Sequence, residues 1–141
     1  MALGGLTCQG SEARMSDLQC PVIVVLVPRE CLASGACARA FEDRRLAGVF
    51  VEAAIAEDAN ALAAISGMAS ASQCGIERLG PIASEEDLEE AAEQLADQFR
   101  GETIALVTTA SVIRSKLHRA TLPTAPVTVA IDSSGWIVTS D

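Results

Sequence analysis

Apolar and polar residues follow one another along the chain in blocks that predict alternating strands and helices. Residues 22–27 and 103–108 are short runs rich in Val, Ile and Leu, which is typical of strands buried on both faces. Residues 49–55 predict a further strand, and residues 73–79 predict a shorter and weaker one. Strands of this kind favour a parallel sheet with helices packed on both of its faces.

The clearest helical pattern follows Ser84. Apolar residues there recur at intervals of three and four positions and form one stripe: Leu88, Ala91, Ala92, Leu95 and Phe99. Ser84 and Asp87 have the spacing of a capping box, in which a hydroxyl and a carboxylate satisfy free amides at a helix start. Weaker patterns, one of them beginning at the cap residue Asp58, predict three more helices, over residues 31–47, 58–68 and 111–121.

The last part of the chain, residues 126–139, is predicted as a β-hairpin whose turn is formed by Asp132-Ser-Ser-Gly135. The alternation of strands and helices predicts an α/β fold, a three-layer sandwich with a mostly parallel sheet, helices on both faces and this hairpin as an antiparallel edge. We expect a single domain over residues 20–141, preceded by a disordered N-terminal extension over residues 1–19.

Net charge narrows the range of partners. The 141 residues carry 10 Lys and Arg against 19 Asp and Glu, a net charge of −9. Because nucleic-acid affinity depends on clustered basic side chains, this balance argues against nucleic acid as a partner, and equally against an anionic membrane surface. The acidic excess between residues 85 and 97 is interpreted as a solvated helix face. Residues 1–14 lack the pattern of a signal peptide, so we expect a cytoplasmic protein.

The cysteine pattern suggests neither a metal site nor a disulfide framework. There are five cysteines with no C-x-x-C pair: Cys8, Cys20, Cys31, Cys37 and Cys74. Cys31 and Cys37 are separated too widely for a zinc knuckle. We therefore predict reduced, mostly buried thiols, with no metal and no cofactor.

Three segments together resemble one known family. They are the strand at 22–27, the strand-and-helix stretch 46–65, and the stretch 102–117, which is followed by the hairpin with its Gly135-Trp136 pair. The stretch 102–117 reads as a strand, a turn and a helix that begins Val-Ile-Arg. These features resemble the histidine phosphatase (phosphoglycerate mutase-like) superfamily, and the resemblance implies a truncated fold of that type.

The same resemblance implies that the family's catalytic residues are missing. Its nucleophilic histidine should follow the first strand, where this chain reads Pro28-Arg29-Glu30, and its second histidine falls on Thr109. Its two glycines are replaced by Ala110 and Ser111.

Other parts of the family's site are also lost. A second phosphate clamp would fall near Ala63 and Ile65, and the general-acid segment is reduced to a few residues around Gly80. The single histidine, His118, lies well inside the predicted helix and away from the strand end. The resemblance thus implies a degenerate enzyme.

Several polar residues are predicted to meet where open α/β sheets bind ligands, beyond the carboxyl ends of the strands. This candidate pocket consists of Arg29, Glu30, Thr108, Thr109 and Ser111. It could bind a small anion at the helix start, or Arg29 and Glu30 could pair with each other or cap neighbouring elements.

Cys31 is a separate candidate thiol, because residues 24–39 resemble the phosphate loop of low-molecular-weight tyrosine phosphatases. That loop requires Cys-x5-Arg, whereas the required position here is Cys37 and the arginine comes two residues late. The alternative is that Cys31 is a buried core residue.

The sequence is compatible with three possible functions. The first is a non-catalytic domain that binds an unknown protein partner or associates with itself, with the terminal hairpin as a possible homodimer surface. The second is a repurposed enzyme that uses Arg29, Glu30, Cys31 or Thr109. The third is a sensor of a small anion or metabolite.

Overall fold

The structure is a computed structural model that describes residues 20–34, 37, 41 and 44–140. These residues form six strands and five helical segments: β2 (Val22–Pro28), η2 (Arg29–Cys31), β3 (Val49–Val51), α3 (Ala53–Ala56), α4 (Ala59–Ser72), β4 (Ile76–Arg78), α5 (Glu85–Gln98), β5 (Thr103–Thr108), α6 (Ala110–Leu117), β6 (Val127–Asp132) and β7 (Gly135–Ser140). The expected N-terminal extension, residues 1–19, lies outside the described residues.

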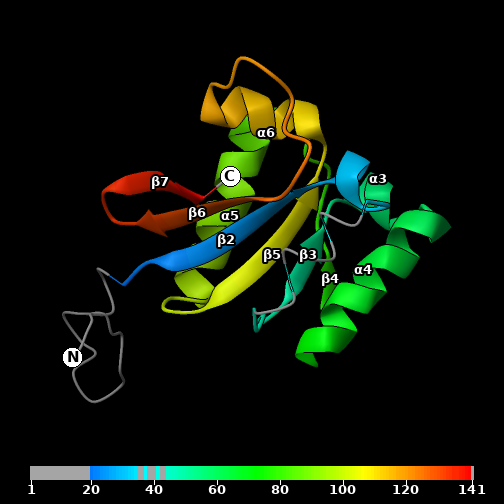
Figure 1. Ribbon diagram of the computed structural model, residues 1–141. Coiled ribbons are helices and arrows are strands. Elements are labelled where there is room, and N and C mark those ends of the chain that lie inside the picture. Colours follow the sequence, from blue (N-terminus) through cyan, green and yellow to red (C-terminus); the bar gives the residue numbers. More distant parts are fainter. Residues whose placement is uncertain (1–19, 35–36, 38–40, 42–43, 141) are drawn as a thin grey trace.

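A six-stranded mixed sheet forms the centre of the fold, in the order β4-β3-β5-β2-β6-β7 (Figure 1). Neighbouring strands from β4 to β2 run parallel, while β6 is antiparallel to β2 and β7 is antiparallel to β6. The predicted parallel sheet with a hairpin at its edge is confirmed. The longest parallel pairing joins β2 to β5, from Ile23 opposite Thr103 to Pro28 opposite Thr108.

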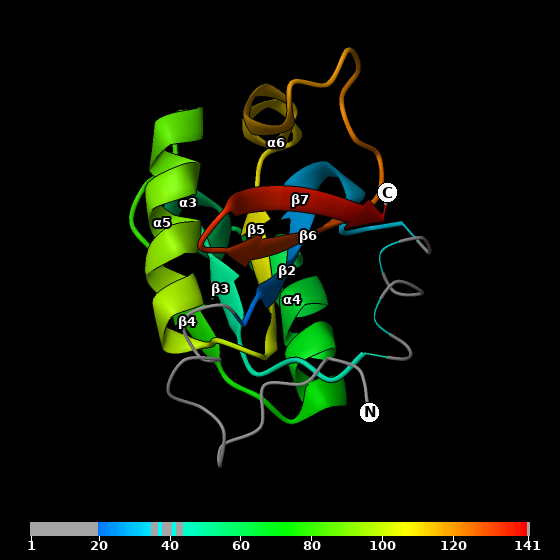
Figure 2. The ribbon, with the colours of Figure 1, turned by 90° about the vertical axis from the view of Figure 1, so that its left-hand side faces the viewer.

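Helices cover both faces of the sheet, as Figure 2 shows with α5 and α4 on opposite sides. Alternate residues of each central strand supply the two cores, because successive side chains of a strand point to opposite faces. Val24 and Leu26 pack in the core beneath α5 and α6. Val25 and Val27 pack in the core beneath α4. This α/β sandwich agrees with the predicted layers.

Strand β3 is shorter than predicted, because the chain leaves the sheet after Val51 and forms the short helix α3. The carbonyl of Glu52 accepts hydrogen bonds from the amides of Ile55 and Ala56, both at 3.0 Å. The alanines of this stretch favour a helical turn over a strand. The prediction of a strand to residue 55 is therefore wrong beyond Val51.

Other boundaries also differ from the predictions. The helix predicted over residues 31–47 differs from the structure at both ends. Cys31 is the last residue of η2, and residues 44–47 are not helical. Most positions between them lie outside the described residues. Helix α4 continues to Ser72, four residues beyond its predicted end. Helix α6 ends at Leu117 rather than at residue 121, because the exposed His118 adopts a left-handed conformation with φ 56°.

The two predicted helix caps are present. Asp58 accepts hydrogen bonds from the amides of Asn60 and Ala61 at the start of α4. Ser84 Oγ accepts from the Asp87 amide at 3.3 Å. Asp87 Oδ2 accepts in return from the amide of Ala83, one residue before the position that a standard capping box uses.

We expect the central pairing of β2 and β5 to dominate stability. Leu106 of β5 is fully buried, so Leu106→Ala should lower the free energy of unfolding by roughly 2–5 kcal/mol through lost burial and a cavity. Urea denaturation followed by circular dichroism measures this. Leu122→Ala is the matched control, because Leu122 is 49% exposed, and it should change stability by less than about 0.5 kcal/mol. Equal losses for the two variants would contradict the assigned core.

Candidate functional site

The carboxyl ends of three parallel strands lie together at one end of the sheet. Pro28 at the end of β2 is opposite Thr108 at the end of β5, and Val51 at the end of β3 is opposite Val107. Neighbouring parallel strands all have their carboxyl ends at the same end of the sheet, so the segments that follow them meet there. The residues predicted to form a pocket belong to the segments at this site, since Arg29 and Glu30 follow β2, Thr108 ends β5, and Thr109 and Ser111 lie at the start of α6.

Glu30 occupies the start of helix α6. Its Oε1 atom accepts a hydrogen bond of 2.9 Å from the amide of Ala110. A helix N-terminus carries free amides and a partial positive charge, and it is the place where a bound anion would be stabilised. The carboxylate of Glu30 thus takes the position that the candidate pocket offers to an anion. Thr109 precedes α6 without a side-chain capping bond, and Ser111 is exposed.

Arg29 points to helix α4 and pairs with its cap residue. The distance from Arg29 Nη2 to Asp58 Oδ2 is 2.8 Å, and the two side chains are 35% and 38% exposed. Asp58 therefore uses one oxygen to cap α4 and the other to bind the guanidinium. A partly exposed pair of this kind contributes little stability, but it engages the one arginine among the five predicted pocket residues.

Thr108 has a buried partner that the sequence reasoning missed. Thr108 is fully buried, and its Oγ1 donates a 3.0 Å hydrogen bond to Oε1 of Glu52, which is 8% exposed. Glu52 falls inside the strand predicted over residues 49–55, so the sequence pattern does not mark it as a strand-end residue. An acidic residue directly after the apolar run 49–51 was the available signal.

Three cavities on the described part of the chain lie outside the predicted pocket. A cavity of about 300 Å³ lies between β4 and α5, where Glu77, Asp87 and Glu90 are among its lining residues. A second, of about 390 Å³, lies beside the hairpin turn and the end of α5, and a third, of about 270 Å³, lies beside the start of β5. None of the three is lined by a residue of the predicted pocket.

Cys31 is not poised as a nucleophile. Its side chain is buried, and the hydrogen bond with the Cys37 thiol, followed by burial itself, raises its pKa far above the ordinary value. A nucleophilic cysteine must ionise near neutral pH, so the environment of Cys31 works against that role. The late arginine of the resembling phosphate loop, Arg39, lies outside the described residues.

The prediction of reduced cysteines is confirmed at three positions and wrong at one. Cys31, Cys37 and Cys74 are free, the first two of them buried. Cys20 is disulfide-bonded. An odd cysteine count and wide spacing gave no indication of which cysteines come close in space.

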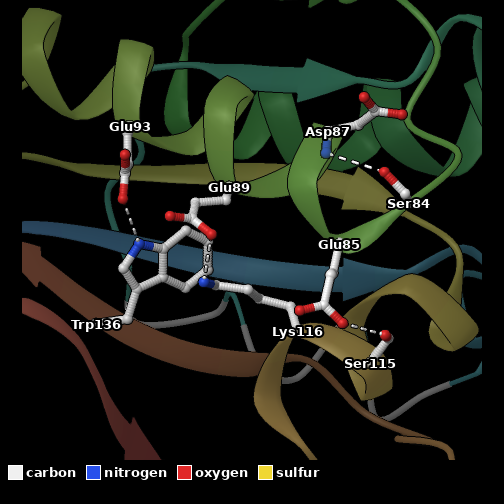
Figure 3. Close-up of polar contacts among 8 residues, drawn as sticks. All are labelled: Ser84, Glu85, Asp87, Glu89, Glu93, Ser115, Lys116 and Trp136. Atoms are coloured by element: carbon white, nitrogen blue, oxygen red, sulfur yellow. Dashed lines mark hydrogen bonds and ion pairs between the residues drawn. The ribbon is translucent and has the colours of Figure 1, made fainter.

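A second polar cluster fastens α6 and the hairpin to α5 (Figure 3). Lys116 Nζ lies 3.0 Å from Glu89 Oε1 and 4.5 Å from the centre of the Trp136 ring. The indole nitrogen of Trp136 donates to Glu93 Oε2 at 3.3 Å, and Ser115 Oγ donates to Glu85 Oε1 at 2.6 Å.

The glutamates of this cluster are spaced four residues apart and therefore follow one stripe of α5. The predicted solvated acidic face is thus in part a contact surface. Because the indole of Trp136 is held there, β7 is attached to the body of the domain as well as to β6.

Comparison with protein family models, with curated proteins and with solved structures gives no match to this chain. No helix among the described residues has both the length and the apolar character needed to cross a membrane. Across the same residues, His, Cys, Asp and Glu side chains do not form a group of three suited to a metal ion.

The Glu30 contact can be tested through stability. Glu30→Ala removes the acceptor of the Ala110 amide and should destabilise the protein by about 1 kcal/mol, as the loss of a helix cap does. Glu30→Gln keeps an acceptor and should cost less. If the carboxylate fills an anion position, phosphate should raise the Tm of Glu30→Ala more than that of the wild type. Chloride at equal ionic strength is the control, and equal shifts would contradict this interpretation.

The raised pKa of Cys31 predicts slow alkylation. Iodoacetamide at pH 7 should leave Cys31 unmodified in the folded protein, since little thiolate is present, and modification should speed up as pH rises. In urea the thiol should react at the ordinary rate. Peptide mapping by mass spectrometry follows each cysteine separately. Rapid modification of Cys31 in the folded protein at pH 7 would show that the thiol is activated.

Proposed function

We propose that this chain is a catalytically degenerate, histidine-phosphatase-like domain that acts by binding rather than by catalysis. The observation that carries the proposal is the Glu30 carboxylate at the start of α6. The resemblance to the histidine phosphatase superfamily implies two positions for reactive histidines, one after β2 and one after β5. The chain has Arg29 and Glu30 at the first position and Thr109 at the second.

The strand pairing supports this relationship. A phosphohistidine mechanism needs the residues that follow these two strands to lie side by side around one phosphoryl group. Strands β2 and β5 are direct parallel neighbours, with Pro28 opposite Thr108, so the frame for such a site is present. The side chains do not suit the reaction, because Arg29 is paired with Asp58 and the Glu30 carboxylate would repel a phosphoryl group.

Strand β7 is the surface that best supports a binding role. It is the last strand of the sheet, and residues 135–140 contain neither a charge nor a proline, the features that usually protect an edge. Ile137 and Val138 are 55% and 43% exposed and point to opposite faces of the strand.

We propose a second copy of the chain as the occupant of this edge. An edge strand without charges can pair with its own copy in antiparallel fashion about a two-fold axis, which joins two sheets into one. The Trp136 contacts hold β7 against α5 and α6, so the edge is presented by a braced element. Exposed apolar side chains on both faces of β7 would then find partners across the axis.

The catalytic half of the proposal predicts no phosphatase activity. The purified protein should not hydrolyse p-nitrophenyl phosphate above the uncatalysed rate, because no histidine is available at the strand ends to accept the phosphoryl group. Arg29→Ala should be indistinguishable from the wild type in the same assay. Hydrolysis by the wild type that is abolished in Arg29→Ala would overturn this half of the proposal.

The binding half predicts a dimer in sedimentation velocity experiments at high protein concentration. Ile137→Lys places a charge on the edge strand and should shift the protein to monomer, because two such charges would face each other across the axis. Leu122→Lys is the matched control, as Leu122 is similarly exposed but lies outside β7, and it should leave the dimer intact. A wild-type monomer at high concentration would rule out this interface.

A further inference from the structure

Three sulfur atoms from separate parts of the chain meet in the core beneath α4. Cys37 Sγ lies 3.9 Å from Sδ of Met68, which belongs to α4. The thiols of Cys31 and Cys37 lie close enough for each to shift the pKa of the other. The three side chains are nearly inaccessible to solvent, with exposed fractions of 3% for Cys31, 2% for Cys37 and 7% for Met68.

A local hydrogen-bond network brings the two cysteines to the same place. Ser34 Oγ donates to the Cys31 carbonyl at 2.9 Å, and the Ser34 amide donates to the same carbonyl, also at 2.9 Å. The Cys37 amide donates to the Ser34 carbonyl at 3.2 Å. Ser34 thus closes two successive turns, which places residues six apart in sequence next to each other.

From this arrangement we propose that Cys31, Cys37 and Met68 form a binding site for a soft monovalent metal ion, Cu(I). Thiolate and thioether sulfurs are the donors that Cu(I) prefers. A metal–sulfur bond of about 2.3 Å places the sulfurs of a trigonal site about 4.0 Å apart. The observed Cys37–Met68 sulfur distance of 3.9 Å, one side of that triangle, matches this spacing.

The surroundings favour Cu(I) over the commoner zinc ion. A structural zinc site needs four ligands, most often from cysteine and histidine, and the described residues around the two cysteines do not supply a further Cys, His, Asp or Glu ligand. The single histidine, His118, lies at the end of α6 on the opposite face of the sheet. Val27 and Ile65 belong to the same apolar core cluster as the two cysteines, and such surroundings suit a low-charge ion with two thiolates and one thioether.

The proton balance of the site is simple. In the structure Cys31 and Cys37 are both free thiols. Binding of Cu(I) forms two copper–thiolate bonds and one copper–thioether bond and releases the two thiol protons to solvent. No electron is transferred, because the copper is supplied in its reduced state.

The test is a Cu(I) competition titration of the full chain against bathocuproine disulfonate, in anaerobic buffer with ascorbate to keep copper reduced. We expect one copper ion per chain and a thiolate-to-copper absorption band in the ultraviolet. Cys31→Ser and Cys37→Ser should each weaken binding at least 100-fold, and Met68→Leu at least tenfold. Cys74→Ser is the matched control, since Cys74 is a free thiol that is not one of the three proposed ligands, and it should bind as the wild type does.

Two further measurements keep the result decisive. Thermal unfolding monitored by circular dichroism shows whether each variant is folded, and X-ray absorption of the wild-type copper complex reports its sulfur neighbours directly, with three expected. The absence of tight Cu(I) binding, or binding that survives both cysteine substitutions, would overturn the proposal. Two sulfur neighbours, or Zn(II) bound more tightly than Cu(I) through the same cysteines, would overturn the Cys31–Cys37–Met68 copper assignment.

Discussion

The parallel pairing of β2 with β5 is the constraint on which the rest of the structure depends. Both strands are buried on both faces, so their side chains supply the cores beneath α5 and α6 and beneath α4. Each fully buried Val or Leu contributes about 1.5–3 kcal/mol relative to an exposed one, so a shift of register by one residue would exchange the two cores at large cost. The same register also decides which side chains meet at the strand ends.

At those ends, the charged side chains are bound by other parts of the same chain. The Glu30 carboxylate lies on the positive start of α6, the Asp58 carboxylate caps α4 and binds Arg29, and Thr108 donates to the buried Glu52. Each of these contacts links two elements that are distant in sequence. The end of the sheet that usually holds a ligand in open α/β folds therefore serves here to join strands to helices.

Strands β5 and β3 show why a sequence pattern predicts the bounds of some strands and not of others. Strand β5 was predicted with its observed bounds, because its burial on both faces leaves a continuous apolar run that needs no further information. Strand β3 was extended too far, because Val49–Ile55 is also continuously apolar apart from Glu52. A local pattern does not separate a buried strand from a strand that runs into a buried helical turn.

The sequence by itself determined the order of the six strands and of α4, α5 and α6, the caps at Asp58 and Ser84, the terminal hairpin and the polar residues that follow β2 and β5. These features depend on side chains close in sequence, which periodicity and capping chemistry describe. Only the tertiary structure decided the partners across long separations: Arg29 with Asp58, Thr108 with Glu52, and the Cys37 sulfur with Met68. Such pairs follow from strand register and helix placement, which are set by the packing of the whole core and leave no local pattern in the sequence.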